Sequence, residues 1–208
     1  MLIYEIQHQQ QYSRGELLLR TFFGWLYIAI PHGIILCFLS LLWWFMCIGA
    51  FFVILFSGIT PQWYYDWTVK LQRWSLRVNA RLDNLSDGYP EFGMDGKDDK
   101  TKFELEFWQI SRGEMLLRFF FGWLYVGIPH IFILWFRSIG TGVLILLAFF
   151  AVLFTGKYPD DWHAFNVGTF RWAMRVNLFL LWLYKDYPPF SGKPDQNKSF
   201  DFENTSGA

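Results

Sequence analysis

Charged side chains are scarce in this sequence. They make up 17% of the 208 residues, whereas 53% are hydrophobic and 22% are aromatic. Aspartate, glutamate, lysine and arginine are missing altogether between Arg20 and Asp66 and again between Arg137 and Lys157. This composition is too apolar for an ordinary soluble domain, and uncharged windows of this length are typical of membrane-embedded segments. We therefore predict an integral membrane protein.

Cysteine and recognisable catalytic motifs are also scarce. Cys37 and Cys47 are too few for a disulfide framework or a zinc site, and both lie in apolar sequence, so we interpret them as small hydrophobic side chains. The glutamine-rich start, Met1 to Tyr12, does not have the pattern of a cleavable signal peptide. Nucleotide-binding glycine loops, nucleophile elbows and zinc-binding helices are missing as well. We expect no enzyme.

An internal duplication is what the sequence does contain. Arg73 to Asn79 reads RWSLRVN and returns as RWAMRVN at 171–177, an offset of 171 − 73 = 98 residues. A long period repeated once indicates a duplicated domain and not a solenoid. We predict a first membrane repeat over 1–92, a charged linker with a short strand over 93–110, a second repeat over 111–190, and a disordered or draped tail over 191–208.

Each uncharged window is too long for one straight crossing. Thr21 to Tyr65 would span about 65 Å as a helix, against a hydrocarbon core of about 30 Å. Arg137 to Gly142 is polar and glycine-containing, which is a turn signal, and Leu39 to Trp44 stands at the matching place. We predict a transmembrane hairpin in each repeat, with a partly re-entrant hairpin as the alternative. Pro31 and Pro129 are expected to kink the first limb.

The distribution of basic residues favours an even number of crossings. Basic residues beside a membrane segment tend to stay in the cytoplasm. One crossing per repeat would place the two near-copies in opposite orientations, although both carry basic residues before and after the apolar window. We therefore predict four crossings, with parallel repeats related by an axis along the membrane normal and with linker and termini in the cytoplasm. Arg20 and Arg118 would be interfacial anchors, each at helix-pair spacing from a glutamate, Glu16 or Glu114.

The predicted fold class is all-α integral membrane. Each of the two tandem repeats contains a kinked transmembrane hairpin and an amphipathic interfacial helix. Phe103 to Phe107 strictly alternates apolar and polar residues, and Ile3 to Ile6 does so less regularly, which predicts a short strand before each repeat. The two strands could pair with each other, and irregular extended chain is the alternative.

A basic stripe marks the amphipathic helix. Lysine and arginine recur there at helical spacing beside an apolar stripe that contains Trp74, a pattern that suits a membrane interface. The alternative is a solvated face on a helix that covers the hairpins. We expect Asn79 and Asn177 to bond backbone at the hairpin ends. The predicted lipid-binding residues are Lys70, Arg73, Arg77, Arg81, Arg171 and Arg175.

Two histidines interrupt the apolar windows. His32 follows Pro31 and His130 follows Pro129, so a twofold axis could bring the rings together around a haem iron or a metal. We prefer the interpretation that each histidine satisfies backbone carbonyls that the proline leaves free. A proton or solute path is a third possibility. We therefore predict no cofactor, with haem as the minor alternative.

Four motifs of the second repeat resemble a known family. They are Ile128-Pro129-His130, the run Phe154 to Pro159, Arg171 to Asn177, and Tyr187 to Phe190. In this combination they resemble the bacterial membrane family called domain of unknown function 4389. The first repeat resembles it with departures, such as Glu91 in place of the second proline. The resemblance implies a bacterial membrane location and a duplicated architecture, without an activity.

These observations give an ordered set of functional expectations. The first is a non-enzymatic accessory or scaffold subunit of a larger bacterial membrane assembly, because twelve tryptophans and wide aromatic faces favour contacts with other helices and with lipid. The second is binding or transport of anionic lipids. A small channel or transporter, or a bis-histidine haem subunit, is weaker. Expected partners are membrane lipids and other membrane-protein subunits, without nucleic acid, in a multi-pass arrangement in the bacterial inner membrane.

Overall fold

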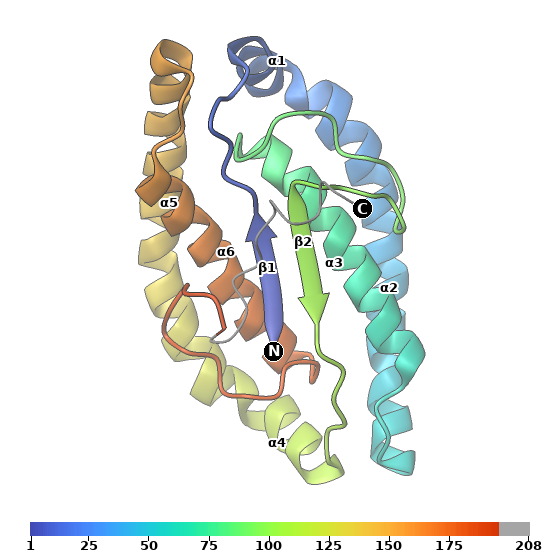
Figure 1. Cartoon of the computed structure of the whole chain (residues 1–208). Coiled ribbons are helices and arrows are strands. Elements are labelled where there is room, and N and C mark those ends of the chain that lie inside the picture. Colours follow the sequence, from blue (N-terminus) through green and yellow to red (C-terminus); the bar gives the residue numbers. More distant parts are fainter. Residues whose placement is uncertain (196–208) are drawn as a thin grey trace.

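The computed structural model describes residues 1–195, and these form helices and one small sheet (Figure 1). Each repeat contributes a strand, a short helix, a π-helical turn, a long helix and a returning helix. The elements are β1 (Leu2–Ile6), α1 (Arg14–Gly24), η1 (Trp25–Ala29), α2 (Ile30–Ser57), α3 (Gln62–Leu82), β2 (Thr101–Leu105), α4 (Arg112–Gly122), η2 (Trp123–Gly127), α5 (Ile128–Thr155) and α6 (Asp160–Leu180).

The first three helical elements of each repeat join into one kinked helix, Arg14–Ser57 and Arg112–Thr155. Both are long and apolar enough to cross a membrane by length and composition. The kink lies at the π-helical turn, where the N–H of Ile30 donates to the carbonyl of Trp25, five residues earlier. Each long helix ends on a left-handed glycine: Gly58 has φ 76° and Gly156 has φ 74°, a conformation that favours glycine at a helix end.

The predicted hairpin turns are wrong. Leu39 to Trp44 lies inside α2, and Arg137 to Gly142 lies inside α5. Arg137 donates to the hydroxyl of Thr169 at 2.8 Å and to the carbonyl of Phe165 at 3.2 Å, both on α6. Because α6 satisfies this polar side chain, the backbone of α5 does not need to turn. The bend lies instead at η1 and η2. The predicted four crossings required a turn in the middle of each long helix, and the structure has no turn at either place.

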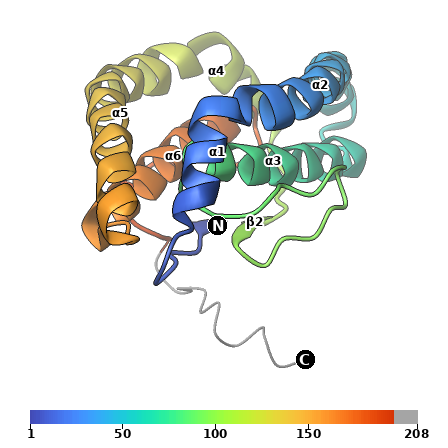
Figure 2. The same cartoon turned by 90° about the horizontal axis from the view of Figure 1, so that it is seen from above.

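The elements form three layers (Figures 1 and 2). The two kinked helices lie on one side, α3 and α6 lie in the middle, and the sheet lies on the opposite side. The returning helices pack on their own repeats, α3 against α2 and α6 against α5, while β2 contacts α3 and β1 contacts α6. In Figure 2, α1 rises from the sheet side to the level of α2, and α5 descends from the level of α4 toward the sheet side. Each kinked helix is therefore an arch.

The two repeats meet head to tail. α1 contacts α5, and α4 contacts α2. Arg14 donates to the carbonyl of Phe154 at 3.0 Å, and Arg112 donates to the carbonyl of Phe56 at 2.7 Å. These carbonyls lie in the last turn of each long helix, where the helix offers no N–H partner. The first repeat therefore contacts the second through the same pair of positions by which the second contacts the first, as a pseudo-twofold axis requires.

The two predicted strands are confirmed, with ends shifted by one or two residues. β1 and β2 pair antiparallel, with Leu2 opposite Leu105 and Ile6 opposite Thr101. Tyr4 and Phe103 are opposite each other and buried. Because each strand precedes a different repeat, their pairing joins the two halves on the side away from the kinked helices.

The exposed large hydrophobic side chains gather on the kinked helices. They run from Leu18 to Phe56 in the first helix and from Leu117 to Phe154 in the second. Phe38 is 66% exposed and the equivalent Phe136 is 54% exposed, each near the middle of its helix. Aromatic and aliphatic surface on this scale marks contact with a membrane or with other proteins.

Candidate functional site

The proline that recurs in both repeats removes one helical hydrogen bond, and a tyrosine hydroxyl takes the place of the missing donor. Pro31 has no N–H to donate to the carbonyl of Tyr27, four residues earlier. The hydroxyl of Tyr89, from the segment after α3, donates to that carbonyl at 3.2 Å. In the second repeat the hydroxyl of Tyr187 donates to the carbonyl of Tyr125 at 3.2 Å. The predicted satisfaction of freed carbonyls therefore occurs, but tyrosine provides it and not histidine.

The histidine of each repeat lies behind this tyrosine. Trp74 Nε1 donates to His32 Nδ1 at 2.9 Å, and Trp172 Nε1 donates to His130 Nδ1 at 2.8 Å. Because Nδ1 accepts, the proton of the neutral ring is assigned to Nε2. His32 Nε2 then donates to the hydroxyl of Tyr89 at 3.1 Å. The first repeat thus has a chain of hydrogen bonds from tryptophan through histidine and tyrosine to the kink.

A phenylalanine covers each histidine ring. Phe92 stacks on His32 with ring centroids 3.8 Å apart, and Phe190 stacks on His130 at 4.0 Å. Both histidines are completely buried within their own repeats, and the two kinks lie near opposite ends of the molecule (Figure 1). The prediction of two facing histidines is wrong. Within residues 1–195, no group of three or more histidine, cysteine, aspartate or glutamate side chains could hold a metal ion.

The second arginine of the repeated RWxxRVN motif is buried in both copies. Arg77 is 2% exposed and donates to the carbonyls of Gly93 and Gly96. Arg175 is 0% exposed and donates to two carbonyls of the segment 191–193 and to the carboxylate of Asp195 at 2.7 Å. These arginines hold the segment after the helix against the helix itself. Residues 191–195 of the predicted tail are therefore anchored, and 196–208 lie outside the described residues.

Two further arginines of the predicted stripe also have protein partners. Arg81 forms two hydrogen bonds to Asp98, at 2.6 and 2.9 Å. Arg171 donates to the carboxylate of Glu5 at 2.7 Å. Both are buried. A lipid headgroup would have to displace these bonds, and the same is true of Arg77 and Arg175, so the structure does not support headgroup contact at these four arginines.

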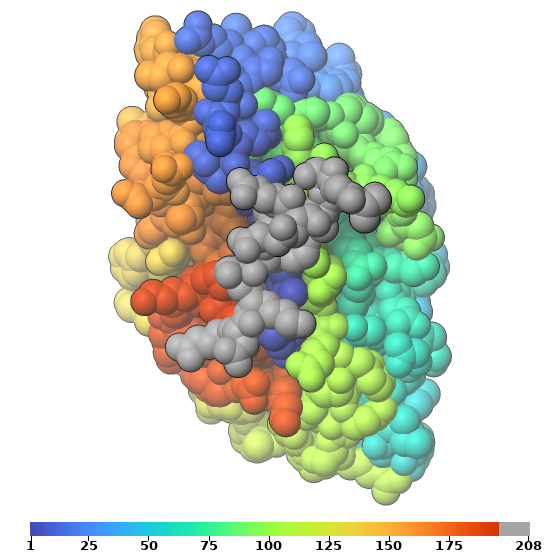
Figure 3. Space-filling view, viewed as in Figure 1, coloured from blue at the N-terminus to red at the C-terminus, as the bar shows by residue number. Residues whose placement is uncertain are grey.

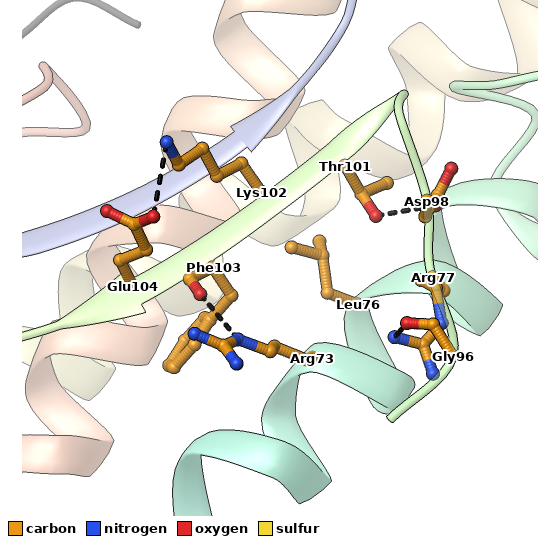
Figure 4. A pocket seen from close by; sticks show the side chains of 9 residues that line it. All are labelled: Arg73, Leu76, Arg77, Gly96, Asp98, Thr101, Lys102, Phe103 and Glu104. Carbon is orange, nitrogen blue, oxygen red and sulfur yellow. Dashed lines mark hydrogen bonds and ion pairs between the residues drawn. The ribbon is translucent and has the colours of Figure 1, made fainter. Parts of the chain in front are cut away.

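Lys70 and Arg73 remain closer to the surface. The ammonium of Lys70 pairs with Asp95 at 2.8 Å. Arg73 is exposed and donates to the carbonyl of Phe103 at 3.0 Å. Figure 4 shows Arg73 reaching from α3 to β2 beside a cavity of about 180 Å³ that Arg77 also lines. Lipid contact at Lys70 and Arg73 stays a prediction.

Arg20 and Arg118 are buried and are not interfacial anchors. Arg20 pairs with the buried carboxylate of Asp87 at 2.7 Å and with Glu16 at 3.0 Å. Arg118 pairs with Glu114 and donates to three carbonyls at the end of α6 and just beyond it. The predicted pairing at helical spacing is therefore confirmed, although the arginines tie helices together inside the protein.

Asn79 and Asn177, which end the RWxxRVN motifs, were expected to bond backbone at hairpin ends. Both side chains are exposed, and the hairpin ends to which they were assigned do not exist, so this prediction is wrong.

Two titratable groups, the half-buried Asp83 and the buried His163, were not recognised in the sequence. Asp83 follows α3, and burial raises its pKa to about 6. His163 lies on α6, where burial, with a smaller contribution from His8, lowers its pKa to about 4. Their counterparts at the offset of 98 are Leu181 and Tyr65, so neither group belongs to the repeated pattern, and a search for repeated residues passes over both.

Replacing Asp83 with asparagine is expected to stabilise the protein at neutral pH. The pKa of Asp83 is higher in the folded protein than in the unfolded chain, so ionisation above about pH 6 opposes folding. Asparagine removes that penalty. The Tm gain should be full at pH 7.5, should shrink as the pH falls from about 6 toward 4, and should disappear only below about pH 3, where the carboxyl is neutral in both states. Thermal unfolding in detergent measures this, and the exposed Asp99→Asn serves as the control. A gain of the same size at pH 3 as at pH 7.5 would contradict the assignment.

The geometry defines a class of protein: a tandem duplication of one kinked-helix domain with an apolar outer surface. Both halves repeat the proline kink, the tryptophan–histidine–tyrosine arrangement and the buried arginine. The family described as Domain of unknown function (DUF4389) matches residues 16–93 and 113–192. The chain belongs to this family and contains two copies of its domain. No curated protein and no solved structure matches this chain.

Proposed function

We propose that this protein is a non-enzymatic accessory or scaffold subunit of a larger assembly in a bacterial inner membrane. The observation that carries the proposal is the exposed aromatic surface of both kinked helices, where Trp25 and Trp123 are each 59% exposed. Tryptophan and phenylalanine are enriched in protein–protein contacts because they bury a large area with few rotatable bonds.

The residues of the repeated motifs support this proposal. Their histidines and arginines are the strongest candidates for chemistry in the sequence, yet each of these side chains has a partner inside the protein. The His32 ring supports the tyrosine at the kink, and Arg77 and Arg175 bind backbone carbonyls. The motifs thus maintain the shape of the domain, which leaves the outer surface to act on partners.

Binding of anionic lipid is the second candidate, and one cavity favours it. The cavity has a volume of about 620 Å³ and lies beside α6, with Arg137 and Lys193 in its lining. Arg171 also lines it, but its guanidinium is held by Glu5 and by two backbone carbonyls. Arg137 extends from the exposed apolar helix α5, so it stands next to the place that acyl chains would occupy. Glu5 and Asp161 also line the cavity, and they weaken its attraction for an anion.

Purification in a mild detergent, followed by native mass spectrometry, tests both candidates. Stoichiometric partner proteins would support the scaffold. Bound phospholipid without partner proteins would support the lipid function, and in that case Arg137→Gln should lower the lipid occupancy while Lys97→Gln, on an exposed loop, should not. A protein that carries neither partners nor lipid would contradict both.

A further inference from the structure

The long helix α2 does not stand alone, because α3 returns along it. The contacts run from one end of the pair to the other: Cys47 with Tyr64, Trp43 with Thr68, and His32 with Trp74. α3 has 21 residues, which is about 31 Å of helix, close to the thickness of about 30 Å of a hydrocarbon core. An orientation that placed α2 across a bilayer would therefore place α3 across it as well.

α3 is unsuited to the interior of a bilayer. It carries Asp66, Lys70 and Arg73 on its outer surface, and the side chain of Lys70 is 45% exposed beside an Asp95 that is 79% exposed. A charged side chain at the bilayer centre costs about 2.5–3.5 kcal/mol even on the most permissive scale. The sheet and its charged linker lie along the same helix and would be immersed with it. Crossing by α2 is disfavoured for this reason. A crossing by α5, which lies on the other side of the sheet in Figure 1, would immerse the same sheet and linker.

The shape of the kinked helices offers another orientation. Each arch has its kink on the side away from the sheet. Figure 2 shows α1 of the first arch and α5 of the second running back toward the sheet side, and the pseudo-twofold relation gives α4 and α2 the same course. The exposed hydrophobic side chains follow the arches. Exposed charged residues such as Lys97, Asp99 and Glu104 lie on the sheet and its linker. The space-filling view of the sheet side shows the strands and the linker between the helices (Figure 3).

We infer that the protein enters only one leaflet of the bilayer. The pseudo-twofold axis lies along the membrane normal, the two kinks reach deepest, and both ends of each kinked helix return to the same membrane surface. A helix is about 10–12 Å thick with its side chains, which fits one leaflet of about 15 Å, half of the hydrocarbon core. The acyl chains of that leaflet are the occupant of the apolar face, and a partner subunit would contact this face within the same leaflet. This inference rests on the proposed membrane location and specifies its geometry.

Thiol labelling from the two sides of the membrane tests this geometry. In a background of Cys37→Ala and Cys47→Ala, single cysteines replace Gln11 before α1, Ile59 after α2, and Lys97 in the linker. All three original side chains are exposed. An impermeant maleimide is applied to intact spheroplasts and to inverted membrane vesicles. We expect all three cysteines to react from the same side, because both ends of the first arch return to one surface.

Labelling of Gln11→Cys and Ile59→Cys from opposite sides would overturn the inference, because a crossing helix separates its two ends. Gln109→Cys and Lys157→Cys, the equivalent positions of the second repeat, provide an independent pair if a variant of the first pair does not accumulate. Extraction of the membranes with alkaline carbonate tests the membrane location separately from the one-leaflet geometry. Release of the protein into the supernatant would refute the membrane location itself, whereas opposite-side labelling of a retained protein would refute only the one-leaflet geometry.

Discussion

Replacement of Arg175 with methionine is expected to lower the free energy of unfolding by about 3–5 kcal/mol. Arg175 is completely buried, and its guanidinium binds the carbonyls of Ser191 and Lys193 and the carboxylate of Asp195. Methionine retains much of the volume but leaves the two carbonyls without this donor and Asp195 without its cation, although Leu2 and Tyr184 still donate to that carboxylate. Losing one partner of such a set is more costly than the bond was favourable. Equilibrium unfolding in mixed detergent micelles measures the loss.

Arg73→Met is the matched control. Arg73 is the first arginine of the same motif in the other repeat, but it is exposed and donates to a single carbonyl. Its replacement should cost less than about 1 kcal/mol. Equal losses in the two variants would contradict the structural role of Arg175. Unchanged stability of Arg175→Met, together with lost anionic lipid, would restore the headgroup interpretation.

Tyr89→Phe is expected to destabilise the protein by about 1–3 kcal/mol, but much less when Pro31 is replaced by alanine. The hydroxyl of Tyr89 supplies the donor that Pro31 cannot give to the carbonyl of Tyr27. Alanine at position 31 restores an N–H near that carbonyl, so the hydroxyl is no longer needed as its donor, and the remaining cost of Tyr89→Phe is the lost hydrogen bond from His32. The two substitutions should therefore couple in a double-mutant cycle. Unfolding of the four proteins under one detergent condition gives the coupling energy.

The second repeat provides the control for this cycle. Tyr187→Phe should couple with Pro129→Ala in the same way, because Tyr187 donates to Tyr125 at the second kink. The mixed pair, Tyr89→Phe with Pro129→Ala, should be additive, since the two residues belong to different kinks. Additive behaviour in the matched pairs would show that the tyrosines do not complete the kinks.

Features encoded over a few residues were predictable from the sequence. The duplication is visible as identities at a fixed offset, and both strands follow from alternation over four or five residues. The kinks at Pro31 and Pro129 follow from the missing N–H. The hairpin turns failed because the length argument assumed a helix that runs straight across the bilayer. The turn signal at Arg137 was misleading, since Arg137 has its partners on α6, and a local pattern carries no information on a neighbouring helix.

The role of the basic stripe could not be read from its spacing. The amphipathic pattern places Arg77 and Arg175 on one face, but the same pattern serves a lipid headgroup and a buried carbonyl equally well. Their partners begin 16 residues later in both copies, at Gly93 and Ser191. One usable signal was overlooked. A tyrosine follows the proline at the same separation in both copies, 89 − 31 = 58 and 187 − 129 = 58. This constant separation links the proline, which lacks an N–H, to the tyrosine, whose hydroxyl replaces that donor.

The reciprocal contacts of Arg14 and Arg112 bear on how this chain arose. Each arginine completes the long helix of the other repeat, so one repeat alone has an arginine without its carbonyl and a helix end without its arginine. Two separate copies of one repeat, placed about a twofold axis, would satisfy both needs at once. Such an ancestral homodimer would assemble only above a threshold concentration. Fusion of the two copies into one chain makes their association independent of dilution, and it frees each half to diverge, as Arg137 has diverged from Leu39.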